Sequence, residues 1–222
     1  MLKRFLDIIF SSTAIVLLTP LLLPVMIILR LTGEGYIFYC QKRIGQHGKP
    51  FNLLKFATMF KDSPNMVGGN ITAKEDPRIF PFGKFLRKYK INEIPQLANV
   101  WIGDMSIIGR RPTVPEHFDF YEEEVKNIIS KHKPGLSGIS SIVFRNEEKY
   151  FINKDTKENK KFYKEKIAPY KGELELWYCK KQSIIVDILL IITTISTVFV
   201  PSLKLHNYFF RDLPKHPLFN PA

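Results

Sequence analysis

The sequence predicts an α/β fold, in which a small sheet and several amphipathic, interfacial helices are anchored to a membrane by an apolar N-terminal segment. Residues 37–39 and 51–56 are rich in aromatic and β-branched side chains and flank a turn, so they predict short strands. From residue 80 onward, several segments carry apolar residues at helical spacing. Residues 5–29 are almost wholly apolar, which predicts a membrane element.

The composition narrows the class of protein. The 222 residues fit one domain with a membrane element, and their net charge of +12 fits nucleic acid, an anionic membrane face or a phosphorylated substrate. No recognition fold for nucleic acid is visible, so nucleic acid is not an expected partner. Cys40 and Cys179 form no disulfide framework, which favours a reducing, cytosolic exposure. The histidines lack metal-ligand spacing, and no glycine-rich dinucleotide motif occurs.

The apolar segment 5–29 is long enough to cross a bilayer, but Pro20 and Pro24 interrupt it. Each proline lacks an N–H group and crowds the carbonyl four residues earlier, so a kink is expected. Pro20 frees the carbonyl of Val16. The hydroxyl of Thr19 is suited to satisfying a freed carbonyl, because lipid supplies no hydrogen-bond partner.

The charges that flank this segment bear on its topology. Lys3 and Arg4 precede it and Arg30 follows it, and positive charge marks the cytoplasmic side of a membrane segment. A re-entrant helix-break-helix over residues 1–32, broken at Thr19-Pro20, would return both ends to one face. The alternative is a single span with a tolerated proline kink.

The elements expected after the anchor follow one another with short connections. Pro95 is acceptable in the first turn of its helix, and Pro169 interrupts the last helix of this group. These elements are a turn at 45–50, a loop at 63–70, and helices at 80–90, 94–100, 113–133 and 154–182.

A second apolar stretch, residues 183–200, is borderline in length for a span. Asp187 and several hydroxyl side chains make it partly amphipathic, which favours a helix lying at the interface or docked on the domain. A second transmembrane helix is the alternative. The sequence therefore predicts a three-part organisation, made of the anchor 1–32, a cytosolic domain 33–182, and the apolar helix with a C-terminal tail 183–222.

Sequence blocks spread over nearly the whole chain carry a family resemblance. In order, they are Gln41–Gly45, Gly48–Phe51, Lys55–Met59, Thr72–Ile79, Phe82–Arg87, Lys90–Pro112, Lys133–Gly138 and Phe144–Glu148. Each block alone is weak evidence, but their order and spacing are highly specific. They resemble the bacterial sugar transferases, which are monotopic membrane phosphoglycosyl transferases of the polyprenol-phosphate type. The re-entrant helix of the smaller family members is broken at a Ser-Pro pair, which Thr19-Pro20 matches.

The resemblance implies a reaction and a place for it. Family members transfer a sugar phosphate from a UDP-sugar to polyprenol phosphate at the cytoplasmic face of the bacterial inner membrane, during glycan or polysaccharide biosynthesis. An Asp of an Asp-Glu pair attacks the β-phosphate, UMP leaves, and the lipid phosphate then attacks the covalent phosphosugar. The Glu is associated with Mg²⁺, a cation that prefers oxygen ligands.

The resemblance also assigns roles to particular residues. Asn92 occupies the position of the nucleophilic Asp, and Glu93 matches the carboxylate associated with Mg²⁺. Lys55, Arg87 and Arg111 match basic residues expected to bind the substrate phosphates, and arginine suits phosphate through its planar fork of donors.

The departures from the family pattern lie at positions close to those expected to take part in the reaction. Asn92 replaces the nucleophile, Ala57 stands where the family usually has Arg, and Arg110 stands where it usually has Pro. A neutral amide is a far poorer nucleophile than a carboxylate. Attack by Glu93 would remove it from the metal, and Asp104 lies twelve residues away. For an ordinary Asn, an exposed position in a turn or a helix cap would be the simplest interpretation.

These observations leave three hypotheses. The first is an active transferase with a modified site. The second is a catalytically dead relative that still binds substrate, or that pairs with an active paralogue in a homo- or hetero-oligomer. The third is a basic membrane-surface protein unrelated to glycan assembly, which the order of the blocks argues against. The absence of the nucleophile and of the family arginine favours the second.

Overall fold

The computed structural model describes residues 1–63, 65–66, 71–72, 75–151 and 156–219. It is a mixed α/β structure with two sheets of two strands each among the described residues, as the sequence predicts for the fold class. The chain divides into two compact units. Unit 1 comprises Met1–Lys42, Asn52–Gly103 and Glu147–Lys161, and unit 2 comprises Arg43–Phe51, Asp104–Asn146 and Phe162–Ala222. The three-part organisation expected from the sequence stays a prediction.

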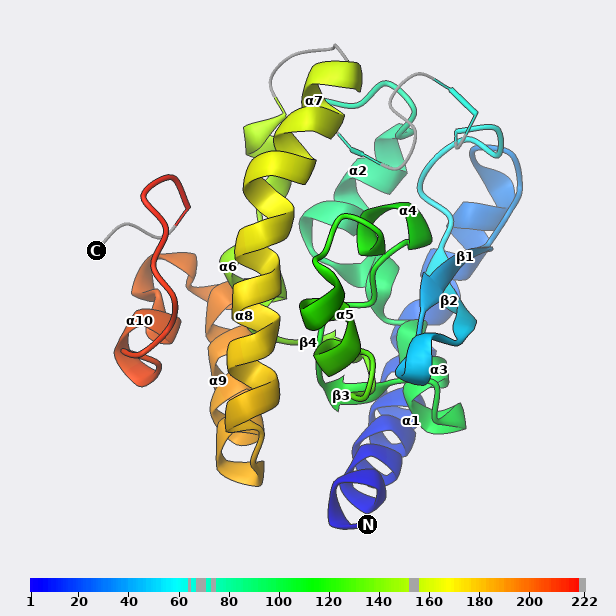
Figure 1. Ribbon diagram of the computed structural model, residues 1–222. Helices are drawn as coiled ribbons and strands as arrows, with labels where there is room; N and C mark the ends of the chain where they lie inside the picture. Colours follow the sequence, from blue (N-terminus) through cyan, green and yellow to red (C-terminus); the bar gives the residue numbers. More distant parts are fainter. Residues whose placement is uncertain (64, 67–70, 73–74, 152–155, 220–222) are drawn as a thin grey trace. The chain divides into compact units, whose positions relative to one another are not determined.

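The N-terminal apolar segment is one helix, α1 (Leu2–Leu31) (Figure 1). Pro20 and Pro24 both lie inside it. The predicted break at Thr19-Pro20 is therefore not confirmed. The Thr19 hydroxyl donates to the carbonyl of Ile15 at 2.7 Å, not to the Val16 carbonyl that Pro20 frees. With 30 residues, α1 is about 45 Å long, and among the described residues it is the helix long and apolar enough to cross a membrane.

The N-terminal half of α1 packs on α3 (Gln96–Ile102) within unit 1. Arg4 donates to the carbonyls of Val100 at 2.5 Å and Trp101 at 2.7 Å. These carbonyls belong to the last turn of α3, where a cation is favourable because the helix leaves carbonyls without internal partners. Asp7 and Ser11 are buried on the same half of α1.

The C-terminal half of α1 enters the apolar core of unit 1. Leu29 is 1% exposed and lies in a cluster with Phe56, Phe80 and Leu86. Partly buried residues of α1 pack against this cluster: Leu22, Val25 and Met26. Because its two halves pack on two parts of the same unit, α1 is held at both ends.

A β-hairpin follows α1 in the sequence. β1 (Phe38–Ile44) and β2 (Pro50–Phe56) pair with each other and are joined by the short turn η1 (Gln46–Gly48), which confirms the predicted strands and turn. His47 and Gly48 have positive φ values of 57° and 72°, so glycine at position 48 meets a backbone requirement of the turn.

Unit 2 contains a parallel pair that the sequence did not predict. β3 (Ser106–Ile108) pairs with β4 (Gly135–Ser137), with Ser106 opposite Gly135. A Cβ atom at Gly135 would lie 2.0 Å from the backbone nitrogen of Gly109, so only glycine fits there. Helices α6 (Ile139–Val143) and α8 (Ala168–Lys181) pack on each other within this unit.

The prediction of a single helix over residues 113–133 is wrong. The segment forms two short helices, α4 (Pro115–Phe118) and α5 (Glu123–Ile129). Glu122 between them is extended, with φ −62° and ψ 151°, and the turn buries Tyr121. Burial of an aromatic ring outweighs the helix propensity of the Glu-rich run, since propensity is only a weak preference.

The remaining helices agree with the sequence pattern. Residues 156–181 are helical through α7 (Thr156–Phe162), the π-helical segment Tyr163–Ile167 and α8, and Pro169 lies in the first turn of α8. The first two residues of the predicted helix 154–182 lie outside the described residues, as do parts of the predicted loop 63–70. The apolar stretch forms α9 (Ile184–Phe199), followed by η5 (Pro201–Leu203) and α10 (Leu205–Phe209).

Candidate functional site

Asn92 and Glu93 lie on a tight turn between two helices of unit 1. α2 (Pro81–Lys88) ends just before Lys90, which takes a left-handed conformation with φ 59°. The 3₁₀ turn η2 (Ile91–Glu93) follows, and α3 begins a few residues later. The turn fixes the direction of the pair relative to α2, because the Glu93 N–H donates to the Lys90 carbonyl at 3.1 Å.

Asn92 is buried, with 6% of its surface exposed. Its Oδ1 atom is buried and has no hydrogen-bond partner among the described residues. An unpaired buried acceptor costs about 1–3 kcal/mol, so such atoms are few in folded proteins. The interpretation of Asn92 as an exposed residue is therefore wrong: it does lie in a turn, but its side chain is buried and its Oδ1 atom has no hydrogen-bond partner among the described residues.

Arg87 is the residue of α2 that the family resemblance matches to an arginine expected to bind phosphate. It lies in the last turn of α2 and donates to the hydroxyls of Thr58 at 3.3 Å and Thr72 at 3.1 Å. Both partners are neutral. Burial lowers the pKa of Arg87, and among nearby carboxylates Glu93 opposes this shift most strongly. Arg87 is thus a partly desolvated cation held by hydroxyls, with donors suited to a phosphate.

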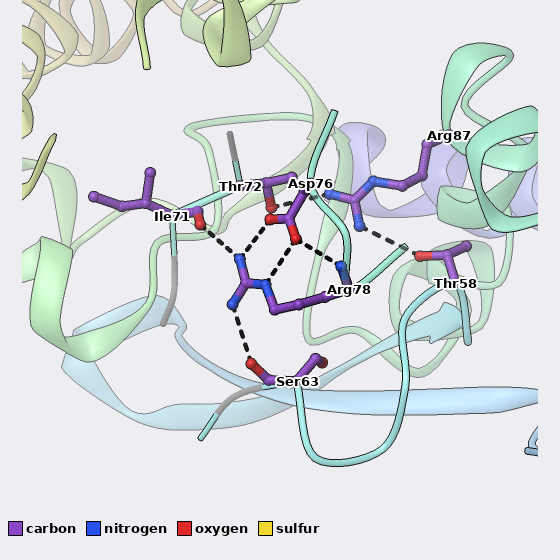
Figure 2. A network of polar contacts seen from close by, with 7 residues as sticks. All are labelled: Thr58, Ser63, Ile71, Thr72, Asp76, Arg78 and Arg87. Carbon is purple, nitrogen blue, oxygen red and sulfur yellow. Dashed lines mark hydrogen bonds and ion pairs between the residues drawn. The ribbon is translucent and has the colours of Figure 1, made fainter. Parts of the chain in front are cut away.

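A buried ion pair, Arg78–Asp76, lies in the same polar network as Arg87 (Figure 2). Arg78 is 2% exposed and Asp76 is 4% exposed, and their closest atoms, Nη2 and Oδ2, are 2.6 Å apart. Arg78 also donates to the carbonyls of Ser63 at 3.0 Å and Ile71 at 2.8 Å. Because Thr72 directly follows Ile71, the same clamp helps to place one of the two hydroxyls that hold Arg87.

Sequence reasoning included Asp76 and Arg78 in a motif but gave them no role. A local signal was present, because Asp76 accepts from the backbone N–H of Arg78 two residues later at 3.0 Å, a typical Asx turn. The partners of the guanidinium were not readable, since Ser63 lies fifteen residues away in sequence.

Further residues of interest in unit 1 lie at the end of β2 and directly after it. Lys55 lies in β2 and is partly buried, and Ala57 follows the strand with its N–H bonded to the Ile37 carbonyl at 2.9 Å. Thr58 comes next. A Cβ atom at Gly83 would lie 2.3 Å from the Thr58 carbonyl oxygen, so glycine there lets α2 approach this strand end closely. Unit 1 therefore carries Lys55, Arg87, Asn92 and Glu93.

Arg111 belongs to unit 2, in the segment after β3. Its guanidinium donates to the Ser141 hydroxyl at 3.0 Å, and its backbone N–H donates to Glu175 Oε1 at 2.8 Å. The neighbouring Arg110 is fully buried and donates to the carbonyls of Ile44 at 3.0 Å and Gly45 at 2.8 Å. The sequence did not indicate any role for Glu175.

The described residues could supply only part of the set of oxygen ligands that Mg²⁺ prefers. Among the described residues, no group of three or more His, Cys, Asp or Glu side chains is arranged to hold a metal ion. Magnesium often uses one or two carboxylates together with substrate phosphates. Glu93 is partly buried and its charge acts on Arg87, so one carboxylate near a cation suited to phosphate is compatible with that mode of binding.

Comparison with known proteins identifies the family. The family model described as bacterial sugar transferase matches residues 1–201. The chain is 33% identical over 211 residues to an uncharacterized sugar transferase of Haemophilus influenzae, which covers 89% of this chain and 41% of that protein. It is 35% identical over 162 residues to the exopolysaccharide production protein ExoY of Sinorhizobium fredii, covering 67% and 71% of the two chains.

A third relative is named for its activity. The chain is 31% identical over 199 residues to the UDP-N-acetylgalactosamine-undecaprenyl-phosphate N-acetylgalactosaminephosphotransferase of Aeromonas hydrophila, covering 89% of this chain and 43% of that enzyme. The chain spans less than half the length of this enzyme and of the Haemophilus protein. The match of the family model to residues 1–201 is decisive, and the chain belongs to the bacterial sugar transferase family.

Proposed function

We propose that this chain binds a UDP-sugar and polyprenol phosphate at the membrane surface, and that phosphoryl transfer by it is strongly impaired. The observation that carries the proposal is the enclosed Asn92, whose Oδ1 has no partner among the described residues, in the turn that follows the phosphate-suited Arg87. The activity for which the Aeromonas relative is named supports the substrate classes.

The chemistry explains the impairment. In the family reaction a carboxylate oxygen bonds to the β-phosphorus while the bond from that phosphorus to the UMP oxygen breaks. The polyprenol phosphate oxygen then bonds to the phosphorus and releases the carboxylate. The Asn92 amide is uncharged and a poor nucleophile, so the first step is not supported. Mg²⁺, held by Glu93 and the phosphates, would neutralise phosphate charge.

Binding does not require the nucleophile. We expect UDP-N-acetylgalactosamine with Mg²⁺ to bind the purified native chain saturably in calorimetry. Arg87→Gln should weaken binding about 10- to 100-fold, because hydrogen bonds to charged groups contribute about 1.5–3 kcal/mol. The matched control is Lys84→Gln, which removes one positive charge from an exposed residue of the same helix. Equal affinities for native chain and Arg87→Gln would contradict the assignment of Arg87.

We further propose that α1 bends at its internal prolines, Pro20 and Pro24, so that it enters the membrane and returns to the same face. Arg4 near its start is bonded to α3, and Leu29 near its end lies in the core of the same unit. The middle of the helix is largely exposed and apolar, including Val16, Leu17 and Leu21. A straight span would separate the two ends by the thickness of the bilayer, about 30 Å. The positive residues at both ends favour the cytoplasmic face.

Cysteine labelling tests this topology. In a chain with Cys40 and Cys179 replaced by Ser, we expect Leu2→Cys and Thr32→Cys to react with an impermeant maleimide from the same side. Both positions are exposed. Inside-out vesicles should label at both positions and spheroplasts at neither. Labelling of the two positions from opposite sides would show that α1 spans the bilayer.

The helix α9 supports a second membrane contact at the interface. Its 16 residues are about 24 Å long, which is short of the bilayer core. Leu190 and Thr193 are buried, and Thr194 is hydrogen bonded to Ser137 at 2.8 Å, so one side is docked on unit 2. The other side exposes apolar residues at helical spacing: Ile185, Ile188, Ile192, Ile195 and Phe199. We propose that this side lies in the membrane interface.

A further inference from the structure

We infer that Glu175 is a positioning residue that holds Arg111 in the orientation needed to contact substrate phosphate. The inference rests on the proposed function, and it takes from the family resemblance the expectation that Arg111 binds phosphate. Glu175 lies in α8 and is 2% exposed. None of the family blocks identified in the sequence includes it.

Glu175 contacts both the backbone of Arg111 and the helix that binds the Arg111 side chain. Its Oε1 atom accepts from the backbone N–H of Arg111 at 2.8 Å and from the hydroxyl of Ser140. Ser141, the next residue of α6, accepts from the Arg111 guanidinium at 3.0 Å. One carboxylate therefore fixes both the backbone of Arg111 and the helix that carries the acceptor for its side chain.

Arg110 makes the charge of Glu175 necessary. This guanidinium is fully buried and its hydrogen bonds go to backbone carbonyls, including that of His132 at 3.2 Å. Neutral carbonyls leave its charge uncompensated, and Glu175 is the largest electrostatic influence that favours its charged form. A buried cation without a counter-charge is strongly unfavourable. Glu175 thus balances Arg110 while it orients Arg111.

The backbone of Arg110 is tethered as well. Its carbonyl accepts from the N–H of Gly135 at 2.8 Å, and its side chain reaches Ile44 and Gly45. Proline, the usual family residue at this position, would fix the backbone by its ring. Here hydrogen bonds of the side chain do so, which gives Arg111 a rigid neighbour.

The remaining oxygen of Glu175 argues for a role beyond stability. Oε2 is buried without a hydrogen-bond partner among the described residues, and burial raises the pKa of Glu175. The charge of Arg110 offsets part of the cost of burying this carboxylate, but its Oε2 atom stays without a partner among the described residues. Such groups are found where a charge orients a functional residue.

The test is a double-mutant cycle read out by nucleotide binding. The probes are UDP with Mg²⁺, which presents phosphates, and uridine, which does not. We expect Glu175→Leu to weaken UDP binding at least about fivefold, in line with the loss of a hydrogen bond that orients a charged donor. Uridine binding should stay unchanged. In an Arg111→Ala background, Glu175→Leu should have no further effect, because it acts through Arg111.

Conservative and control variants sharpen the result. Glu175→Gln keeps an acceptor for Arg111 and Ser140 but removes the charge that balances Arg110, so it should retain UDP affinity to within about threefold while lowering the melting temperature. Glu173→Gln, an exposed neighbour in the same helix, should leave it unchanged. If Glu175→Leu does not fold, Ser141→Ala in the same cycle decides, since it removes an acceptor of the Arg111 guanidinium and leaves Glu175 in place.

The outcomes separate this inference from the proposed function. Phosphate-dependent binding by the native chain that Glu175→Leu and Ser141→Ala leave unchanged would overturn the positioning role alone. Additive effects of Glu175→Leu and Arg111→Ala would also overturn it. A native chain that binds neither UDP nor UDP-N-acetylgalactosamine would instead contradict the proposed function.

Discussion

Changing Asn92 to Asp should raise UMP release from a UDP-sugar by at least about a thousandfold, because removal of a nucleophile from an enzyme of this kind commonly lowers the rate by several powers of ten. The cation expected to bind the substrate phosphates remains in place, since Thr58 and Thr72 hold Arg87 by hydrogen bonds. The assay contains purified protein, UDP-N-acetylgalactosamine, Mg²⁺ and undecaprenyl phosphate, and follows UMP with time.

A matched control makes this gain specific. Asn127→Asp introduces the same chemical change on a residue of α5 and should leave UMP release at the native level. Rapid release by the native chain would contradict the impaired-transfer account. If neither the native chain nor Asn92→Asp acts, the changes at Ala57 and Arg110 have removed needed contacts, and Ala57→Arg in the Asn92→Asp background tests this.

Replacing Arg78 with Met should lower the free energy of unfolding by about 3–5 kcal/mol. The change leaves the Asp76 carboxylate buried without its cation and removes the donors to the Ser63 and Ile71 carbonyls (Figure 2). Loss of one partner of a buried pair is more harmful than loss of both. A thermal melt in detergent measures the change in transition temperature.

The partner variant distinguishes an uncompensated charge from lost packing. Asp76→Asn combined with Arg78→Met should recover part of the stability that Arg78→Met loses, because it removes the carboxylate that Arg78→Met leaves uncompensated. Lys84→Met, a similar substitution at an exposed site, should melt as the native chain does. A native-like melting temperature for Arg78→Met would show that the ion pair does not hold this region together.

The parts of the fold that follow from local signals were predictable. The hairpin β1–β2 was readable because a glycine-containing turn separates two short runs with strand propensity, and α2 was readable because its apolar residues have helical spacing. The pair β3–β4 was not readable, since each strand has only three residues and its partner lies far away in sequence. The division of residues 113–133 depends on burial of Tyr121, which is also a tertiary effect.

The residues of the candidate site also differ in whether the sequence could reveal them. Family resemblance pointed to Arg87 and Arg111, and the structure gives each a defined set of partners. It did not point to Arg78 or Glu175, because their roles come from partners distant in sequence. The burial of Asn92 was contrary to the behaviour expected of an ordinary Asn, since asparagine is mostly exposed in turns and caps.

Equilibrium dialysis of the native chain against UDP-N-acetylgalactosamine labelled with ³²P at the β-phosphate tests the central claim, binding without transfer, most directly. After saturable binding with Mg²⁺, the protein is denatured and the label is recovered. The account predicts that the label leaves as intact UDP-N-acetylgalactosamine and that none stays on the chain. Label retained covalently on Asn92, Glu93 or any other residue, or the absence of saturable binding, would contradict it.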